Sequence, residues 1–598
     1  MVHSRIMAKE QEVASVERLV AEGGIASDES AVEEPEIEAD EGSVEEHVKE
    51  PDESSVWKGG DGEVGCPIRM GAWSYSPRCG RKLHVAPDGV DEKTVCLMHS
   101  KDPGKQLGPL CDAFWLEFEK VLEEAGESAA NFEHFVFPPL DFRSRKFLVA
   151  CKFSHATFTK DAFFSNATFA CNADFSFAIF AQDAMFVSAT FMMHANFFKA
   201  IFKQEAHYYH ATFMQSLNFN CATFMRRANF GHTIFKQKAE FAEATFTRDA
   251  DFSDTVFTQD AYFSAASFSE NTIFDSATFE QHADFLYVVF TLAARFEYTR
   301  FYGTAKWQNS RFLDRAHFRN TMFDPKILGK PSAVFELASF SKPGEIVFDN
   351  VDLSRAIFHN CDVSQVWFTS SVKWGKRQDN HGLAVFEETF EDTLPLDDVA
   401  WGILYGGGQR YRAVAQIYQQ LKKNYDSRLD YWTANEFHFG EMEMKRLAGP
   451  INGPLLWLRR WWHRNFSFVA WYKYASDYGN SYGKPLLWLL GTLLAAALLF
   501  PITGLELKQP ISGNAANSAR VTYSSEWDKN NSWTNKFWAE AKLIGKSGIT
   551  AIDTATFQRT PEYAPAYPCG RVVAIFETLL TSSLFALFLL AIRRQFRR

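Results

Sequence analysis

Three cysteines and one histidine in the first hundred residues have the types and spacing of metal ligands. Cys96 and His99 are separated by two residues, as in one half of a zinc knuckle, and Cys66 and Cys79 precede them. Thiolates and imidazole suit tetrahedral Zn²⁺, and the ion would stabilise a segment that has little apolar content of its own. We therefore predict a structural zinc site formed by Cys66, Cys79, Cys96 and His99.

Other interpretations of this cluster remain open. The gap between Cys66 and Cys79 is wide for a zinc ribbon, so His84 and Cys111 compete for the fourth ligand position. Free buried thiols are the second interpretation. Catalytic zinc is disfavoured because nothing supplies a general base beside an open coordination position. Since no nucleophile elbow, phosphate loop or paired-carboxylate motif stands out either, we expect the protein not to be an enzyme.

Two apolar segments near the C-terminus are predicted to span a membrane. Residues 485–502 carry no charge, and residues 572–592 carry one, that of Glu577. Lys and Arg side chains precede the first segment and follow the second, which by the positive-inside rule places both flanks in the cytoplasm. We expect a multi-pass protein of the cell inner membrane with cytoplasmic N- and C-termini.

The loop between these segments suggests a pore. It ends in an amphipathic stretch, 533–546, and a turn-rich segment that runs to residue 571. This order of a first helix, a short pore helix with a re-entrant turn and a second helix resembles the plan of two-helix tetrameric cation channels. By this resemblance Thr554 and Thr556 lie in the place of the filter. Glu577 is either a pore-facing or pairing residue, or it snorkels to the interface. Both filter glycines are missing, so potassium selectivity is not implied.

An aromatic ladder fills the middle of the chain and sets the fold. From 142 to 323 an aromatic residue recurs at alternating steps of five and six, and 32 of the 34 are Phe, with Tyr208 and Trp307 as the exceptions. Two residues before each aromatic residue lies a small side chain, which is Ala at 23 of the 31 such positions in 156–321. These steps fit neither a helix nor a strand. They fit a square coil with one inward aromatic and one inward small residue on each side, a right-handed quadrilateral β-helix over 131–375.

The repeats at 167–177, ATFAC and ADFSF, resemble the pentapeptide-repeat motif. One extra residue in every second unit departs from that family and predicts 22 residues in each coil, whereas strict steps of five at 346–368 match it. Some soluble members of the family mimic DNA with an acidic face. Here residues 142–323 hold 18 Lys and Arg against 16 Asp and Glu, so we expect no nucleic-acid mimicry and no nucleic-acid partner.

Two further segments are similar to parts of other pentapeptide-repeat proteins. Residues 79–99 resemble an N-terminal module of such proteins, and residues 419–446 resemble a helical segment that joins repeat and membrane parts in some bacterial members. Apolar stripes at 411–425 and 432–446 predict two helices. We expect them to cap the last coil, whose strand groups are otherwise unpaired.

An acidic N-terminal segment precedes these parts. Residues 1–55 hold 17 Asp and Glu against 4 Lys and Arg, and with few aromatics they are predicted to be disordered. They lack the basic start and apolar stretch of a signal peptide. The predicted organisation is an acidic tail (1–60), a Cys/His module with a helix (61–130), the solenoid (131–375), a helical cap and juxtamembrane segment (376–483) and a membrane domain (484–598).

The sequence leaves two functions open. One is a channel-like membrane protein whose cytoplasmic solenoid senses a partner or gates a pore. The other is a non-conducting scaffold that two helices anchor. We expect an unidentified protein partner on the β-helix surface in both cases, and a homo-oligomer, which would be a tetramer if the protein is channel-like.

Overall fold

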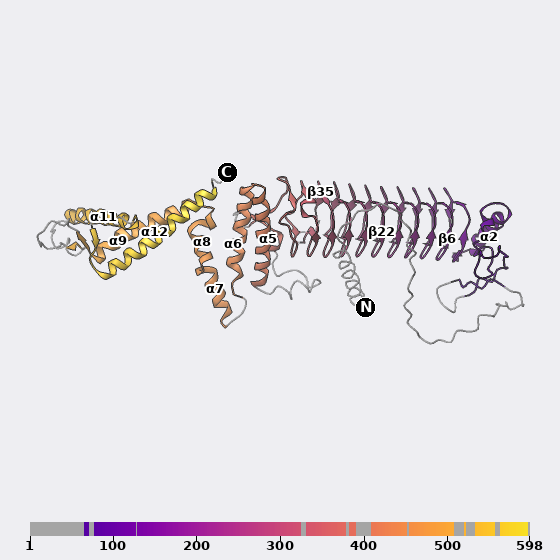
Figure 1. Ribbon diagram of the computed structural model, residues 1–598, viewed down its shortest axis with the longest axis horizontal. Coiled ribbons are helices and arrows are strands. Elements are labelled where there is room, and N and C mark those ends of the chain that lie inside the picture. The colour runs from indigo at the N-terminus through magenta and orange to yellow at the C-terminus, as the bar shows by residue number, and fades with distance from the viewer. Residues whose placement is uncertain are drawn as a thin grey trace, which may run out of the picture. The chain divides into compact units, whose positions relative to one another are not determined.

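The computed structural model shows a β-solenoid followed by helices (Figure 1). It describes residues 65–70, 77–126, 128–324, 330–377, 382–389, 408–450, 454–507, 520–521, 533–556 and 563–595. The longer helices are α2 (Pro109–Ala125), α5 (Gly408–Ser427), α6 (Tyr431–Ala448), α7 (Leu456–Phe466), α8 (Phe468–Ser476), α9 (Gly483–Thr503), α11 (Trp533–Ala555) and α12 (Pro568–Gln595). The predicted acidic tail lies outside the described residues.

The solenoid consists of parallel sheets whose strands are mostly two residues long. Four sheets form its sides, and they run from β1 (Ala130–Asn131) to β40 (Ala356–Ile357), from β2 (Val136–Phe137) to β38 (Ser339–Phe340), from β3 (Leu140–Asp141) to β41 (Trp367–Phe368), and from β4 (Lys146–Phe147) to β36 (Met322–Phe323). Ala173 pairs with Ala195, which is a register of 22 residues. Phe348 pairs with Phe368 in the tract with steps of five. The predicted fold of stacked four-sided coils is therefore confirmed.

Short strands and turns outside the coils complete the described secondary structure. Two strands of the solenoid are four residues long, β35 (Ala316–Arg319) and β39 (Ile346–Asp349), and β39 follows the 3₁₀ helix η2 (Pro343–Glu345). The other short elements are η1 (Pro103–Gln106), β42 (Gly375–Lys376), β43 (Leu383–Ala384), α3 (Phe386–Thr389), η3 (Asp477–Gly479), β44 (Leu505–Leu507), β45 (Arg520–Val521) and β46 (Tyr563–Pro565).

Stacked rings fill the interior of the solenoid. Phe164 lies parallel to Phe186 of the next coil, with ring centroids 4.7 Å apart, which matches the spacing of neighbouring strands. Phe175 and Phe186 meet edge to face at 5.8 Å. Both arrangements are favourable for aromatic pairs. The small residues two positions before the rings, such as Ala178 and Ala184, are fully buried.

Two kinds of corner alternate along the chain and explain the steps of five and six. At a five-residue corner the amide of Ala156 donates to the carbonyl of Phe153 at 3.0 Å, and His155 between them has a φ of 58°. Positive φ at the third position is typical of a type II turn and suits Asn well, as at Asn166 and Asn309. Such residues recur about every 11 positions, and the six-residue corners among the described residues have none.

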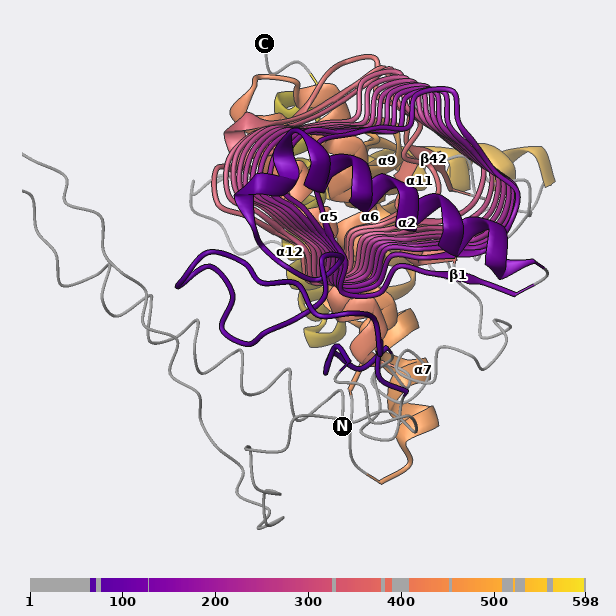
Figure 2. The same ribbon diagram turned by 90° about the vertical axis from the view of Figure 1, so that its right-hand side faces the viewer.

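The aromatic ladder continues on both sides of the alternating tract 142–323, within the predicted solenoid of 131–375. Phe132 begins it, and Phe118 of α2 stacks on Phe132 with centroids 4.5 Å apart, so α2 lies across the first coil (Figure 2). At the other end Phe335 stacks on Trp307 at 4.8 Å. The alternating steps of five and six predict a ladder that begins only at Phe142.

Helix α5 caps the last coil. Asn424 donates from Nδ2 to the carbonyls of Val363 and Val366, both at 2.7 Å. Arg428 donates from Nη1 to the carbonyl of Phe368 at 2.7 Å. These side chains satisfy strand groups that a following coil would otherwise bond, and α5 and α6 are the helical pair that the apolar stripes predicted.

One polar atom in the ladder gives a prediction. Tyr208 is fully buried between Phe186 and Phe230, and its hydroxyl has no hydrogen-bond partner among the described residues. An unpartnered buried hydroxyl costs about 1 to 3 kcal/mol. Tyr208→Phe should therefore raise the free energy of unfolding by about 1 to 2 kcal/mol, measured by urea denaturation. A destabilised Tyr208→Phe variant would show that the hydroxyl is satisfied.

Candidate metal centre and membrane helices

Cys66, Cys79, Cys96 and His99 converge at one point. The four ligand atoms lie within 4.8 Å of one another. The Cys79 and Cys96 sulfurs are 3.8 Å apart, and His99 Nδ1 is 3.1 Å from Cys96 Sγ and 3.4 Å from Cys66 Sγ. A tetrahedron with metal–sulfur bonds of about 2.3 Å has sulfur–sulfur edges of about 3.8 Å and sulfur–nitrogen edges of about 3.5 Å. These four residues can hold a metal ion.

A folded-back chain explains why the wide gap between Cys66 and Cys79 is no obstacle. The amide of Cys66 donates to the carbonyl of Arg81 at 2.9 Å, and the amide of Cys79 donates to the carbonyl of Ile68 at 2.7 Å. This antiparallel pairing brings the two thiols to one end of a hairpin. The turn that begins at Cys96 then supplies the other two ligands, because the amide of His99 donates to the Cys96 carbonyl at 3.0 Å.

Hydrogen bonds around the cluster favour the protonation states in which the ligand atoms can bind a cation. His99 Nε2 lies 3.2 Å from the carbonyl of Glu133, which can only accept, so Nε2 carries the hydrogen and Nδ1 is left to bind a metal. Arg81 donates from Nη1 to Cys79 Sγ at 3.1 Å. Hydrogen bonds with the Cys66 and Cys96 thiols hold the pKa of Cys79 well below its usual range. Three thiolates this close repel one another unless a cation lies between them.

The two competing ligands lie outside the cluster. His84 Nε2 is 2.7 Å from Asp102 Oδ2, and Cys111 is part of α2. Lys105 was not predicted from the sequence, and its buried Nζ donates to the carbonyls of Leu97, Ser100 and Val136 at 2.8, 2.7 and 2.6 Å. Burial lowers the pKa of Lys105 to about 7. This lysine connects the Cys/His cluster to β2 of the solenoid, and no sequence pattern predicted it.

Two of the described helices, α9 and α12, are long and apolar enough to cross a membrane. Helix α11 packs against both. Ser547 of α11 donates from Oγ to the carbonyl of Ala497 at 2.5 Å, and Thr554 of α11 donates from Oγ1 to Glu577 Oε2 at 3.0 Å. Glu577 is 6% exposed, and its Oε1 has no partner among the described residues. Within one chain the Glu577 carboxylate therefore contacts α11 through Thr554.

Helix α11 is longer than the predicted amphipathic stretch. It was expected to end at Lys546 but continues to Ala555. Thr554 is therefore helical, and its carbonyl accepts a hydrogen bond from Thr578 Oγ1 at 3.2 Å. Thr556 donates back to the carbonyl of Ile552 at 2.7 Å. Contacts with α9 and α12 keep this β-branched segment helical, and residues 557–562 of the expected re-entrant turn lie outside the described residues.

Comparison with known families identifies the repeat. The family model of pentapeptide repeats (9 copies) matches residues 241–289 and 285–325. The solenoid is a pentapeptide-repeat domain. No curated protein and no solved structure gives a significant match to the chain. Pentapeptide-repeat solenoids are typically structural or interaction folds, because their sides are flat and repetitive.

A buried cluster of charges joins the pentapeptide-repeat solenoid, through its cap, to the apolar helices. Glu443 of α6 accepts hydrogen bonds from Tyr478 Oη at 2.8 Å and from Lys473 Nζ at 3.0 Å. Burial alone would raise the pKa of Glu443, but the hydrogen bonds and charge of Arg446 outweigh it and lower this pKa to about 2. Arg594 at the end of α12 donates to the carbonyl of Tyr478 at 2.5 Å. The cap, α8 and α12 thus share one hydrogen-bonded cluster.

Proposed function

We propose that this protein is a membrane-anchored scaffold. The pentapeptide-repeat solenoid presents a repetitive surface to a protein partner in the cytoplasm, and α9 and α12 fasten it to the inner membrane. The observation that carries this proposal is the cluster of Glu443, Tyr478 and Arg594, because it connects the capped solenoid to the end of an apolar helix. A structural Zn²⁺ ion at the cysteine cluster would hold the first coil closed.

A second function is favoured by one specific observation. Helix α11 lies between the two apolar helices in sequence and packs against both, as a pore helix does. In an oligomer, several copies of α12 would then surround a central axis. The contact between Glu577 and Thr554 weakens this alternative, because it directs the carboxylate toward α11 of the same chain.

Bilayer recording of the purified full chain separates the two functions. The scaffold proposal expects the protein to float with lipid vesicles after alkaline washing, to pass no current, and to behave like its Glu577→Gln variant. A cation current that falls in Glu577→Gln but persists in Glu280→Gln, together with a tetramer in mild detergent, would replace the scaffold by a channel. Glu280 is a matched control because it lies on the solenoid far along the chain from α12.

A further inference from the structure

Helix α7 has two unlike sides. Its cationic side packs on α6, where His463 Nδ1 lies 3.2 Å from the carbonyl of Arg446 and Arg460 donates from Nε to the carbonyl of Pro450 at 3.3 Å. Its other side carries tryptophans that are largely exposed, although Trp462 stacks on Phe466 of the same helix with ring centroids 4.7 Å apart. Trp457 is 71% exposed and Trp462 is 60% exposed. Large exposed aromatic surface next to cationic side chains marks a contact with something outside the chain.

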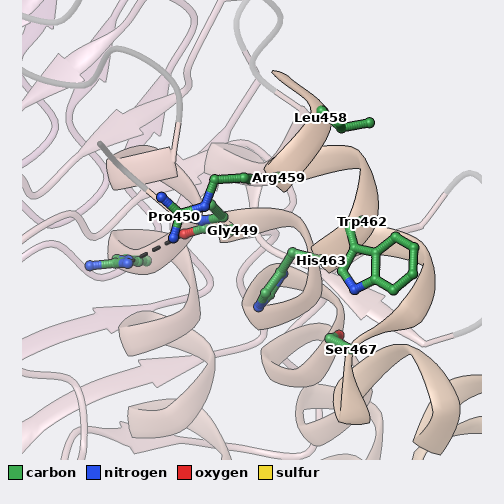
Figure 3. A pocket seen from close by; sticks show the side chains of 8 residues that line it. Gly449, Pro450, Leu458, Arg459, Trp462, His463 and Ser467 are labelled. Atoms are coloured by element: carbon green, nitrogen blue, oxygen red, sulfur yellow. Dashed lines mark hydrogen bonds between the residues drawn. The ribbon is translucent and has the colours of Figure 1, made fainter. Parts of the chain in front are cut away.

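A cavity of about 620 Å³ opens where α7 meets the end of α6. Arg412, Arg459, Trp462, His463 and Ser467 line it together with the Gly449–Pro450 corner. Arg459 and His463 leave α7 on the side that faces Gly449 and Pro450, and the Trp462 ring leaves it on the other side (Figure 3). Arg412 reaches in from α5 and donates from Nη2 to the carbonyl of Gly449 at 3.4 Å.

The lining of this cavity suits a phosphate ester. Two guanidinium groups, from Arg412 and Arg459, can each offer paired N–H donors to phosphate oxygens. His463 uses Nδ1 as a donor to a carbonyl, because a carbonyl can only accept, so Nε2 is the ring atom left for a ligand. No carboxylate belongs to the lining, and Leu458 and Trp462 add apolar surface beside the charged groups. The expected ligand therefore has an anionic head and an apolar part.

The location of the cavity near the start of the apolar helix α9 favours a lipid as the source of that phosphate. Helix α8 follows α7 and contacts the first turns of α9, where Trp488 donates from Nε1 to the carbonyl of Tyr474 at 3.2 Å. Residues 455–484 carry five Lys and Arg and one acidic residue, Asp477. Tryptophan and arginine together at the start of an apolar helix are typical of the membrane–water interface. Phe468 at the start of α8, which is 96% exposed, is a further aromatic side chain that is open to such an interface.

We propose that the cavity between α7 and α6 binds the phosphate of an anionic phospholipid while the tryptophans of α7 lie among the headgroups. This inference rests on the proposed membrane anchoring. Arg412 and Arg459 hold the phosphate, His463 contributes a further polar contact, and Trp462 contacts the apolar part of the lipid next to the headgroup. The solenoid cap would then be held against the membrane surface, because Arg412 belongs to α5, the helix that closes the last coil.

Native mass spectrometry of the full chain in detergent tests the site. Phosphatidylglycerol should bind at least about tenfold more tightly than phosphatidylcholine, because each arginine near an anionic lipid contributes about 1 kcal/mol, which is about fivefold in affinity. Arg412→Gln/Arg459→Gln should remove this preference. Lys160→Gln/Lys236→Gln, with the same change of charge on exposed solenoid residues, should keep it. Arg412→Gln alone, at an exposed residue, should lower the preference about fivefold and guards against a misfolded double variant.

Three outcomes would overturn the lipid site. Equal binding of both lipids would show that the cavity does not select an anionic headgroup. An unchanged preference in the double variant would place the binding elsewhere. Inorganic phosphate that displaces phosphatidylglycerol at equal concentration would assign the cavity to a free anion. Vesicle flotation tests the membrane anchoring by itself, so a chain that floats but shows no lipid preference refutes only the lipid site.

Discussion

Phe241→Ala should lower the free energy of unfolding by about 3 to 5 kcal/mol. Phe241 is fully buried in the middle of the stack, with Phe219 and Phe263 stacked on its two faces at centroid distances of 5.3 and 5.0 Å. Phe230 and Phe252 meet it edge to face at 5.5 and 5.6 Å. Removing the ring leaves a cavity that its neighbours cannot close, because backbone pairing fixes the distance between coils.

Urea denaturation and hydrogen exchange would measure this effect. Lys236→Ala is the matched control, since Lys236 is an exposed residue five positions earlier and should cost under about 0.5 kcal/mol. Each coil contacts only its neighbours, so faster exchange should centre on the coils around residue 241. Similar small losses in both variants would show that the ring stack does not hold the solenoid together.

Most of the solenoid could be predicted because its signal is repeated. One Phe and one Ala in each side specify the inward face, and a single exception such as Leu217 does not change the period. The ends were harder to predict. At Phe132 and Phe335 the alternation of five- and six-residue steps is interrupted. Phe132 packs on Phe118 of α2, and Phe335 packs on Trp307 of the preceding coil. A periodic sequence pattern predicts contacts only between residues that follow it. Contacts with segments that lack the pattern, such as α2, therefore could not be predicted.

The candidate sites could likewise be predicted only where the residues that form them are close in sequence. Cys96 and His99 are close in sequence and could be paired from their spacing, whereas the place of Cys66 and the exclusion of His84 depend on a hairpin that no residue pattern specified. Lys105 could not be found because its partners are backbone carbonyls, which every residue has. Likewise, Glu577 could be recognised as the one carboxylate in a long apolar segment, but its contact with Thr554 depends on how far α11 extends.

The purified full chain should contain one zinc ion, and Cys96→Ser should remove it. Serine stays protonated at neutral pH and is a poor ligand, whereas three thiolates and an imidazole bind Zn²⁺ with an apparent free energy of about 10 to 16 kcal/mol in small zinc domains. Cys96 is buried at the centre of the cluster, within 3.8 Å of Cys79 Sγ and 3.1 Å of His99 Nδ1. Loss of Cys96 therefore breaks the site. Elemental analysis gives the zinc content directly.

Loss of the metal should loosen one end of the protein and leave the rest folded. The cluster contacts the first coil through the hydrogen bond from His99 to the carbonyl of Glu133. Hydrogen exchange in Cys96→Ser should therefore rise across residues 77–108, while amides near Phe241 stay protected, because coils far along a solenoid do not share contacts. Cys171→Ser, at a half-buried thiol of the solenoid, is the matched control and should keep both the zinc and the protection. Wild-type protein that is metal-free yet protected over 77–108 would assign these cysteines to packing alone, because the segment would then hold its fold without an ion.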